Sequence, residues 1–444
     1  MEALANQRLT LERLRKRITR RLAILVNSCV HCGLCSDSCH YYLAENSNRF
    51  IPAFRTDRLS SLFRRYHTWL GRRIPFWVGA KGVEELSIKE LTDAVFGECS
   101  MCGRCAINCS VGLDIGFLIR EARKILAELD QVPGGLQSTV DKAVTTGNNM
   151  AITEEELIGT LQWLEEELQQ EVADRRAKIP LNKVGARVLY TLNPREPKFF
   201  PLSIIAIAKI FYAADEDWTI SSTNFDATNY AYYSGDDQAA RTIAGRLVEE
   251  TERLGARILA VTECGHAYRS LRWEAPNWLG KRFDFQVKSI LELIADYIRQ
   301  GRIRLDSSIH SAPVTLHDPC NLVRYGGVME VQRYILRKAV SNFVEMHPNR
   351  ERNYCCGGGG GLLSMSEYAE LRLKAGKAKA EQIRRTGAKV VAAPCHNCID
   401  QLMELNKKYK LGIETKTIGE IVADALILPS RRVNSAIESA SKKG

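Results

Sequence analysis

The sequence predicts a helical domain built around two cysteine runs, followed by an α/β region of two similar halves. Within residues 1–130, two cysteine runs of identical spacing are separated and followed by segments with apolar residues at helical spacing. From Ala186 onward, short apolar strands alternate with helices, which is typical of parallel α/β units. The segment LGARILAVTEC, ending at Cys264, is echoed by TGAKVVAAPC, ending at Cys395, and this internal similarity indicates the two halves.

Composition excludes several classes of protein. The chain has 444 residues, of which 45% are apolar and 26% charged, so a disordered or fibrous chain is excluded. The net charge of +10 is a modest bias that suits a phosphate-rich membrane face or an acidic partner as well as nucleic acid. The sequence shows no motif that reads nucleic acid, and we expect no nucleic-acid partner.

The chain is expected to be cytoplasmic. Its longest apolar run, residues 199–214, contains Lys209 and is shorter than the roughly 17 residues that a membrane span needs. The basic N-terminal segment, residues 9–25, is either a solvated helix on the first domain or a docking element for anionic lipid or a membrane subunit. Reducing surroundings favour metal or redox roles for the 14 cysteines over structural disulfides.

The first domain carries the spacing C-x2-C-x2-C-x3-C twice. In two-cluster ferredoxins, the fourth cysteine of each such run binds the other cluster. The sequence therefore predicts two cubane [4Fe-4S] clusters. The first would be held by Cys29, Cys32, Cys35 and Cys109, and the second by Cys99, Cys102, Cys105 and Cys39. The alternative is zinc, which prefers two paired knuckles around one tetrahedral ion.

The two runs differ from those of compact ferredoxins, because His40 and Ser110 stand where those proteins have proline. A further 59 residues, with helical patches, separate Cys39 from Cys99. The domain resembles the helical ferredoxin domain of the C-type polypeptide of heterodisulfide reductase and of the glycolate oxidase iron-sulfur subunit. The helix expected at residues 114–129 would close this domain near residue 130.

Residues 131–185 are predicted to be a helical linker. Thr153 and Glu156 form a capping box in front of an amphipathic helix that begins near Leu157. The two α/β halves are expected at residues 186–305 and 306–428. The tail, residues 429–444, is polar and predicted to be flexible.

The second half contains three cysteine motifs. Cys320 lies in HDPCN, Cys355 and Cys356 open CCGGGGG, and Cys395 and Cys398 form PCHNC. This pattern resembles the CCG domain found in the B-type and D-type polypeptides of heterodisulfide reductase. The resemblance implies two pseudo-equivalent Rossmann-like halves in an α/β CCG domain after the α-helical ferredoxin domain.

The same resemblance implies a noncubane [4Fe-4S] cluster held by all five of these cysteines. We expect the backbone of Gly357 and Gly358 to approach it closely, since glycine has no Cβ. A phosphate-binding loop is disfavoured because Leu362 breaks the glycine pattern. Alternatives for Cys395 and Cys398 are a thioredoxin-like redox pair or half of a zinc site.

The first half departs from this pattern. The stretch SSTNFDATNYAYYSGDD stands where a cysteine pair is expected, and VTECGHA keeps Cys264 but has Ala267 at the second position. One thiol cannot hold a second noncubane cluster. Cys264 and His266 are instead candidates for a catalytic thiol and proton carrier, the alternative being that Cys264 is a small buried hydrophobe.

The combined features resemble the DsrK, HmcF and TmcB type of iron-sulfur subunit. This resemblance implies an oxidoreductase subunit of the disulfide reductase or thiol oxidase type, active in a complex on the inner face of the cell membrane. Its expected partners are a cytochrome b-like or quinone-reactive membrane subunit and a small DsrC-like thiol or disulfide protein. The alternatives are a pure electron relay without its own substrate, and the iron-sulfur subunit of a glycolate or lactate oxidase.

Overall fold

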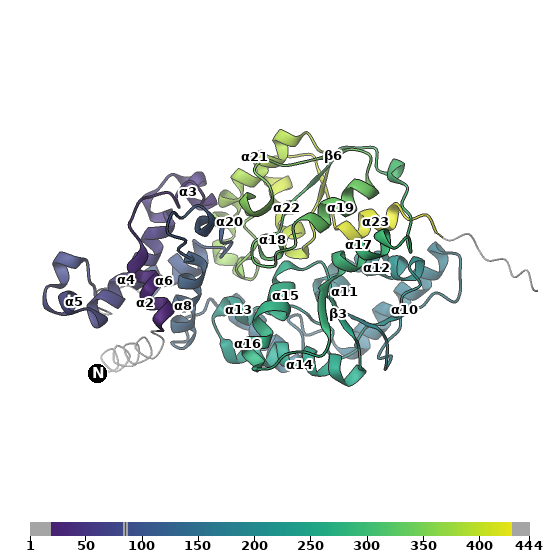
Figure 1. Cartoon of the computed structure of the whole chain (residues 1–444), viewed down its shortest axis with the longest axis horizontal. Coiled ribbons are helices and arrows are strands. Elements are labelled where there is room, and N and C mark those ends of the chain that lie inside the picture. The colour runs from purple at the N-terminus through teal and green to yellow at the C-terminus, as the bar shows by residue number, and fades with distance from the viewer. Residues whose placement is uncertain (1–18, 83–84, 86–87, 429–444) are drawn as a thin grey trace, which may run out of the picture.

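A computed structural model describes residues 19–82, 85 and 88–428 (Figure 1). The expectations for the chain before residue 19 and for the tail 429–444 concern residues outside these ranges. Figure 1 shows an elongated molecule with the N-terminal helices at one end and the two sheets toward the other. Among the described residues, no helix combines the length and the apolar character needed to cross a bilayer.

Every regular element in the described part of residues 19–130 is helical. The α-helices are α2 (Arg20–Ser28), α3 (His40–Glu45), α4 (Pro52–His67), α5 (Trp69–Arg73), α6 (Ile88–Thr92), α7 (Arg104–Ile107) and α8 (Ile115–Ala127). Short helical turns are η1 (Asn48–Phe50), η2 (Pro75–Val78) and the π-helical η4 (Asp93–Gly97). Asp114 caps α8 by accepting a hydrogen bond from the Phe117 amide at 3.0 Å. The apolar face of α8 is buried, so this helix forms the centre of the N-terminal core.

Two helices connect this region to the sheets. The helix α9 (Gly134–Thr146) buries Leu136 and Val140 in the N-terminal core. The helix α10 (Glu154–Glu171) begins with the predicted capping box, in which the Glu156 amide donates to Thr153 Oγ1 and the Thr153 amide to Glu156 Oε2. Its leucines pack into the core of the first sheet, so residues 131–185 belong in part to both neighbouring cores.

Two parallel sheets of four strands follow, with the same strand order. The first, in the order β2-β1-β3-β4, consists of β1 (Val188–Tyr190), β2 (Trp218–Thr219), β3 (Ile258–Val261) and β4 (Gln286–Ser289). The second, in the order β6-β5-β7-β8, consists of β5 (Val314–Leu316), β6 (Phe343–Val344), β7 (Val390–Ala392) and β8 (Glu414–Lys416). Equal order and direction fit two Rossmann-like halves, as the sequence predicts.

Helices cover both sheets. In the first half they are α11 (Arg195–Phe199), α12 (Pro201–Ala213), α13 (Ala231–Ser234), α14 (Asp237–Leu254), α15 (Gly265–Arg269), α16 (Ala275–Leu279) and α17 (Ile290–Arg299), with the π-helical η5 (Ser270–Glu274). In the second half they are α18 (Cys320–Val323), α19 (Glu330–Ala339), α20 (Ala369–Ala375), α21 (Lys377–Thr386), α22 (His396–Tyr409) and α23 (Ile418–Asp424). The longest apolar run forms α12, which packs between α10 and α23 in the interior.

The turns after β3 and β7 have the same backbone geometry. The Cys264 amide donates to the Thr262 carbonyl at 2.6 Å, and the Cys395 amide donates to the Ala393 carbonyl at 2.7 Å. Each cysteine is then the residue directly before the next helix, α15 or α22. Cys264 and Cys395 therefore occupy equivalent positions at the carboxyl ends of their strands, where ligands bind in open α/β sheets.

Candidate metal centres

The first cysteine-lined cavity lies at the N-terminal end of the molecule. The loop between α2 and α3 supplies three thiols, and the chain after α7 brings the fourth cysteine of the second run beside them. Apolar side chains, including Ala53 of α4 and Leu113, complete the wall. Cys32 is exposed, so this cavity borders solvent. The four thiols are those of Cys29, Cys32, Cys35 and Cys109.

The second cavity collects the remaining thiols of the two runs, those of Cys39, Cys99, Cys102 and Cys105. Arg55 of α4 is buried beside them, and its Nη2 donates to Cys39 Sγ at 2.8 Å. Burial disfavours the charge, but the thiolates of Cys39 and Cys99 outweigh it and raise the pKa of Arg55. The Met101 amide lies 3.4 Å from Cys99 Sγ, a second hydrogen bond that a thiolate accepts.

The third cavity lies where the two α/β halves face each other. It is lined by all five cysteines of the second half, Cys320, Cys355, Cys356, Cys395 and Cys398. They come from three segments, which follow β5, β6 and β7 and include the first turns of α18 and α22. The Sγ atoms of Cys356 and Cys398 are 3.6 Å apart, and the donor atoms of these two cysteines and His317 lie within 4.8 Å of one another.

The glycine run lies beside the third cavity. Gly357 donates its amide to Cys355 Sγ at 3.3 Å, but it does not line the cavity. Gly358 packs on α22, where an added Cβ would lie 2.8 Å from Gln401 Cβ. Gly359 and Gly360 line the cavity itself, so they join Gly357 and Gly358 as backbone positions close to these cysteines. The sequence revealed the glycine run but not which glycines face inward.

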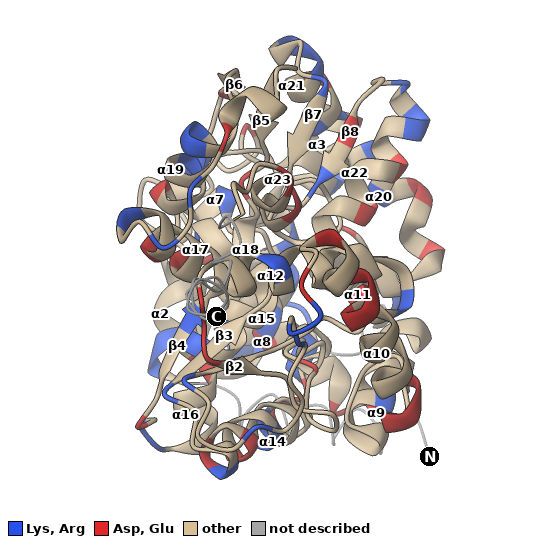
Figure 2. Cartoon of the chain, turned by 90° about the vertical axis from the view of Figure 1, so that its right-hand side faces the viewer, with Lys and Arg blue, Asp and Glu red and all other residues tan. Residues whose placement is uncertain are grey.

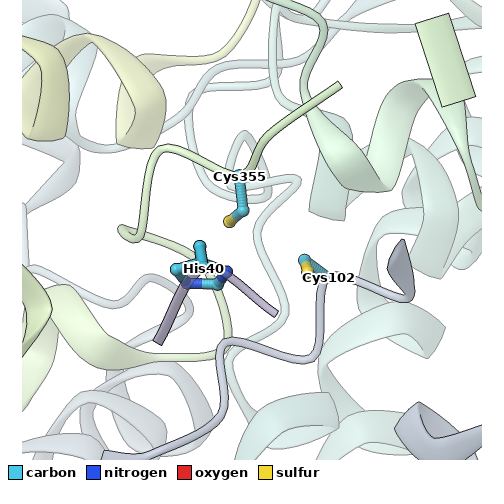
Figure 3. A group of neighbouring side chains, drawn as sticks. All are labelled: His40, Cys102 and Cys355. Atoms are coloured by element: carbon cyan, nitrogen blue, oxygen red, sulfur yellow. The ribbon is translucent and has the colours of Figure 1, made fainter. Parts of the chain in front are cut away.

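The second and third cavities meet through side chains of two different domains. Figure 3 shows His40, Cys102 and Cys355 pointing toward one another, and their donor atoms lie within 4.8 Å. Between them, Ser100 Oγ lies 3.4 Å from His40 Nε2 and 3.5 Å from Cys355 Sγ. An added Cβ on Gly360 would lie 2.8 Å from the Ser100 carbonyl oxygen, so the two loops are in backbone contact. Sequence reasoning missed Ser100 and gave His40 no role, because their neighbours are distant in sequence.

Cys264 is buried next to the third cavity. Its Sγ lies 3.2 Å from His266 Nδ1, and His266 lines the cavity wall. Burial, together with the neighbouring thiol of Cys395, raises the pKa of Cys264. Burial also lowers the pKa of His266 to about 4. Both shifts disfavour a thiolate and imidazolium pair at these two side chains.

Further wall residues come from motifs that the sequence had already marked. Tyr233 lies in the stretch that replaces a cysteine pair in the first half, and it forms part of α13. Asn397 lies between Cys395 and Cys398, and its Nδ2 donates to Tyr230 Oη at 3.1 Å. His317 precedes Cys320 in the motif HDPC. Their positions inside these motifs were the only sequence signal that could have placed them at the cavity wall.

The donor sets of the three cavities fit iron-sulfur clusters. Each set is dominated by cysteine thiols, soft ligands that favour iron-sulfur clusters, zinc or copper(I) over hard cations. Two sets of four thiols match cubanes, whereas a single tetrahedral zinc ion would use only four of the five thiols in the third. Hydrogen bonds from Arg55, Met101 and Gly357 to cysteine sulfurs are the kind that tune such clusters.

Comparison with known proteins agrees with these donor sets. Residues 25–113 match the 4Fe-4S dicluster domain, and residues 314–403 match the CCG cysteine-rich domain. The Hdr-like menaquinol oxidoreductase iron-sulfur subunit 2 of Archaeoglobus fulgidus is 27% identical over 92% of this chain and 81% of that protein. The D-type polypeptide of the dihydromethanophenazine:CoB–CoM heterodisulfide reductase of Methanosarcina barkeri is 26% identical over 93% of this chain and 96% of its own length.

A more distant relative is the EtfAB:quinone oxidoreductase of Syntrophomonas wolfei, which is 21% identical over 90% of this chain and 58% of that protein. The similarity to all three extends beyond both cysteine motifs and includes the first α/β half. The chain thus combines a 4Fe-4S dicluster domain with a CCG cysteine-rich domain, and over most of its length it is similar to the iron-sulfur subunits of heterodisulfide-reductase-like proteins.

Proposed function

We propose that this chain is the iron-sulfur subunit of a heterodisulfide-reductase-like membrane complex. It passes electrons between a quinone-reactive or cytochrome b-like membrane subunit and a small thiol or disulfide protein of the DsrC type. The first two cavities would each hold a cubane [4Fe-4S] cluster, and the third a noncubane [4Fe-4S] cluster. Bound there, these clusters supply one-electron transfer steps, and two such steps with two protons convert a disulfide into two thiols.

The observation that carries this proposal is the contact between the second and third cavities. His40 and Cys102 of the dicluster domain meet Cys355 of the CCG domain, with Ser100 between them. The first cavity is open to solvent at Cys32, whereas the third ends at the buried pair Cys264 and His266. A series of redox sites with one solvent-exposed end and one end beside a thiol suits electron transfer between an external carrier and a sulfur substrate.

The proposed role of Cys264 and His266 is to supply a thiol and carry a proton beside the third cavity. Cys264 occupies the position equivalent to Cys395 but belongs to the half that lacks the other cluster cysteines. Asn193 Nδ2 lies 3.9 Å from Cys264 Sγ and holds it from the side of β1. His266 forms part of the cavity wall, so it can exchange a proton with a sulfur substrate there.

The names of the relatives support a membrane-linked role. Two of them are parts of a menaquinol oxidoreductase and of a heterodisulfide reductase. A third is a quinone oxidoreductase. A quinone-linked electron source and a disulfide-linked acceptor are therefore the partners that we propose for this chain.

The first experiment is the iron, sulfide and zinc content of the anaerobically purified protein, compared with the Cys356→Ala variant. Three clusters predict about 12 irons per chain, and about 8 after loss of the third. Zinc should be absent. About 8 irons in both proteins would contradict the third cluster and favour a simple electron relay.

The second experiment separates a disulfide-active protein from a pure relay. The Cys264→Ser variant should retain about 12 irons, because Cys264 is not among the thirteen proposed ligands. It should lose turnover of a DsrC-type disulfide or trisulfide. Unchanged turnover in this variant would assign Cys264 to packing alone.

A further inference from the structure

The end of the molecule beyond α4 exposes an unusual number of large apolar side chains. We define the α5 tip as residues 69–78, which comprise α5, the linking residue Ile74 and η2. Phe76 is 98% exposed, Trp77 81% and Trp69 65%. Leu70 and Ile74 are also exposed. Single exposed apolar residues are common on protein surfaces, but a group of five within nine residues marks an interaction site.

Hydrogen bonds and a close backbone contact hold the α5 tip against the end of α4. Thr68 caps α5 by accepting a hydrogen bond from the Gly71 amide at 3.0 Å. Gly71 lies against the end of α4, where an added Cβ would lie 2.0 Å from the Arg64 carbonyl oxygen. The Ala80 amide closes the turn by donating to the Pro75 carbonyl at 2.9 Å. The exposed side chains therefore belong to a hydrogen-bonded helix and turn.

The charge around the α5 tip has one sign. Residues 58–82 contain six Lys and Arg residues and no Asp or Glu. Arg72 and Arg73 are both exposed, and neither has a carboxylate partner within salt-bridge distance among the described residues. The Arg73 guanidinium lies 5.9 Å from the centre of the Trp69 ring. The surface thus combines tryptophan, phenylalanine and arginine side chains.

Figure 1 shows α5 at the extreme end of the molecule, on the side away from both sheets. The helix α4 connects it to the first and second cavities, which Ala53 and Arg55 line in turn. With 16 residues, α4 is about 24 Å long. No other part of the described chain reaches as far in this direction in Figure 1. The tip can therefore touch a flat surface before the rest of the dicluster domain does.

We propose that the α5 tip docks on an anionic phospholipid surface. Phe76 and Trp77 enter the boundary between headgroups and acyl chains, where aromatic side chains are enriched in membrane proteins. Arg72 and Arg73 pair with lipid phosphates, since arginine binds phosphate with a planar fork of donors. This contact would place the dicluster domain against the membrane and both sheets on its far side.

Lipid is favoured over a protein partner by the charge and the position of the tip. Aromatic and arginine side chains occur at both kinds of surface, but residues 58–82 carry six cations and no carboxylate, and the tip is the first part of the described chain to reach a flat anionic surface on this side. Attraction to an anionic surface is worth roughly a fivefold gain in affinity for each arginine near it. The proposal does not depend on the redox partner, because it concerns a surface far from the third cavity.

The test is sedimentation of the full-length holoprotein with vesicles of phosphatidylcholine containing phosphatidylglycerol. Wild-type protein should bind these vesicles and bind pure phosphatidylcholine less tightly. Raising the salt from 0.1 to 1 M should weaken binding, because the Debye length falls from about 10 to about 3 Å. The double variant Phe76→Ser/Trp77→Ser should bind at least about tenfold more weakly. The variant Arg72→Gln/Arg73→Gln should lose most of the preference for anionic lipid.

The matched control is Trp163→Ser. Trp163 is 46% exposed on α10, whose surface is acidic, as Figure 2 shows. This variant removes an exposed tryptophan from the other end of the molecule and should bind vesicles like wild type. Iron content and far-ultraviolet circular dichroism check that every variant is folded and loaded.

Two outcomes would overturn the proposal. The first is vesicle binding that is unchanged in Phe76→Ser/Trp77→Ser, which would assign membrane contact to another segment. The second is no binding to protein-free vesicles together with binding to vesicles that contain the purified membrane subunit. That second result would make the α5 tip a protein interface.

Discussion

At the scale of single residues, Ser100 stands out because it contacts two cluster sites at once. It belongs to the second cysteine run, between Cys99 and Met101. Its hydroxyl nevertheless lies 3.5 Å from Cys355 Sγ, a ligand that we assign to the third cluster. A hydroxyl that donates to a ligand sulfur stabilises the more negative, reduced state of a cluster.

The substitution Ser100→Ala should therefore lower the reduction potential of the third cluster. Loss of one hydrogen bond worth about 1 kcal/mol corresponds to about 40 mV for a one-electron couple. The measurement is a redox titration followed by electron paramagnetic resonance. Ser110→Ala is the matched control, because Ser110 Oγ lies 4.0 Å from Cys32 Sγ at the first cavity. An equal shift of the third cluster in both variants would contradict the assigned contact.

A second residue, Asp226, links stability to pH. It is buried in the first half, where its carboxylate accepts hydrogen bonds from the Asn149 amide and from Thr228. Burial outweighs these bonds and raises the pKa of Asp226 to about 7, against about 3.9 in an unfolded chain. The folded state then binds more protons than the unfolded state between about pH 4 and pH 7.

Because the folded state binds the additional proton, Asp226 contributes stability that is fully present below about pH 4. This contribution is lost as the pH rises through about 7. The slope is at most about 1.4 kcal/mol per pH unit. In Asp226→Asn, the melting temperature should depend less on pH between 5 and 8 than in the wild type. The exposed Asp141→Asn on α9 is the control. Identical pH profiles in Asp226→Asn and wild type would show that the carboxyl group is ionised throughout.

At the scale of elements, the sequence predicted what depends on local pattern. The capping box of α10, the helix after Asp114 and the strand before Cys264 all formed where apolar spacing and capping residues indicated. Contacts between loops are different, because they depend on distances that no periodicity encodes. The glycine run is such a case, since only the packed structure distinguishes Gly360, which lies on Ser100, from Gly358, which lies on α22.

This distinction gives a prediction for the loop. Gly360 has a φ of +69° and would place a Cβ 2.8 Å from the Ser100 carbonyl oxygen. Gly387, at the end of α21, has a φ of +66° with no atom within 4 Å of the added Cβ. Both Gly→Ala variants carry the cost of a left-handed backbone, roughly 1–2 kcal/mol. The Gly360→Ala variant should lose more, and it should weaken the magnetic interaction between the second and third clusters.

Melting temperature and power-saturation electron paramagnetic resonance measure the two effects. If Gly360→Ala and Gly387→Ala lost the same stability, and the spectra were unchanged, the loop contact with Ser100 would not be tight. A larger loss in Gly360→Ala alone would confirm that the absence of a Cβ allows the two domains to meet at this point.

At the scale of the whole molecule, the sequence predicted two parallel α/β halves and the cysteine sets but not how the domains are held together. The segment TNYAYYSGDD was recognised only as the place of a missing cysteine pair. In the structure it forms α13, which packs against α8 of the dicluster domain. Neither residue type nor spacing indicates this contact, because both partners are apolar faces that could have packed within their own domain.

Arg123 of α8 joins three parts of the chain. Its side chain is fully buried and donates to the carbonyls of Val95 and Cys99 in the dicluster domain, of Tyr233 in α13 and of Gly360 in the CCG loop. Burial lowers its pKa to about 10, so the guanidinium stays charged at pH 7. Four carbonyls satisfied by one cation fix the dicluster domain against both α/β halves.

Replacing Arg123 with leucine would leave these four carbonyls without their donor, at a cost of about 1–3 kcal/mol for each one that water does not reach. We expect Arg123→Leu to separate the dicluster domain from the sheets more than it unfolds either. Limited proteolysis should then cut near residues 128–135, and electron transfer between the second and third clusters, followed by freeze-quench spectroscopy, should slow. Arg302→Leu is the matched control, because Arg302 donates only to Ala214, Asp215 and Glu216 within the first half. That variant should lower the melting temperature without new cleavage between the domains, and equal cleavage in both would show that Arg123 has no special part in joining them.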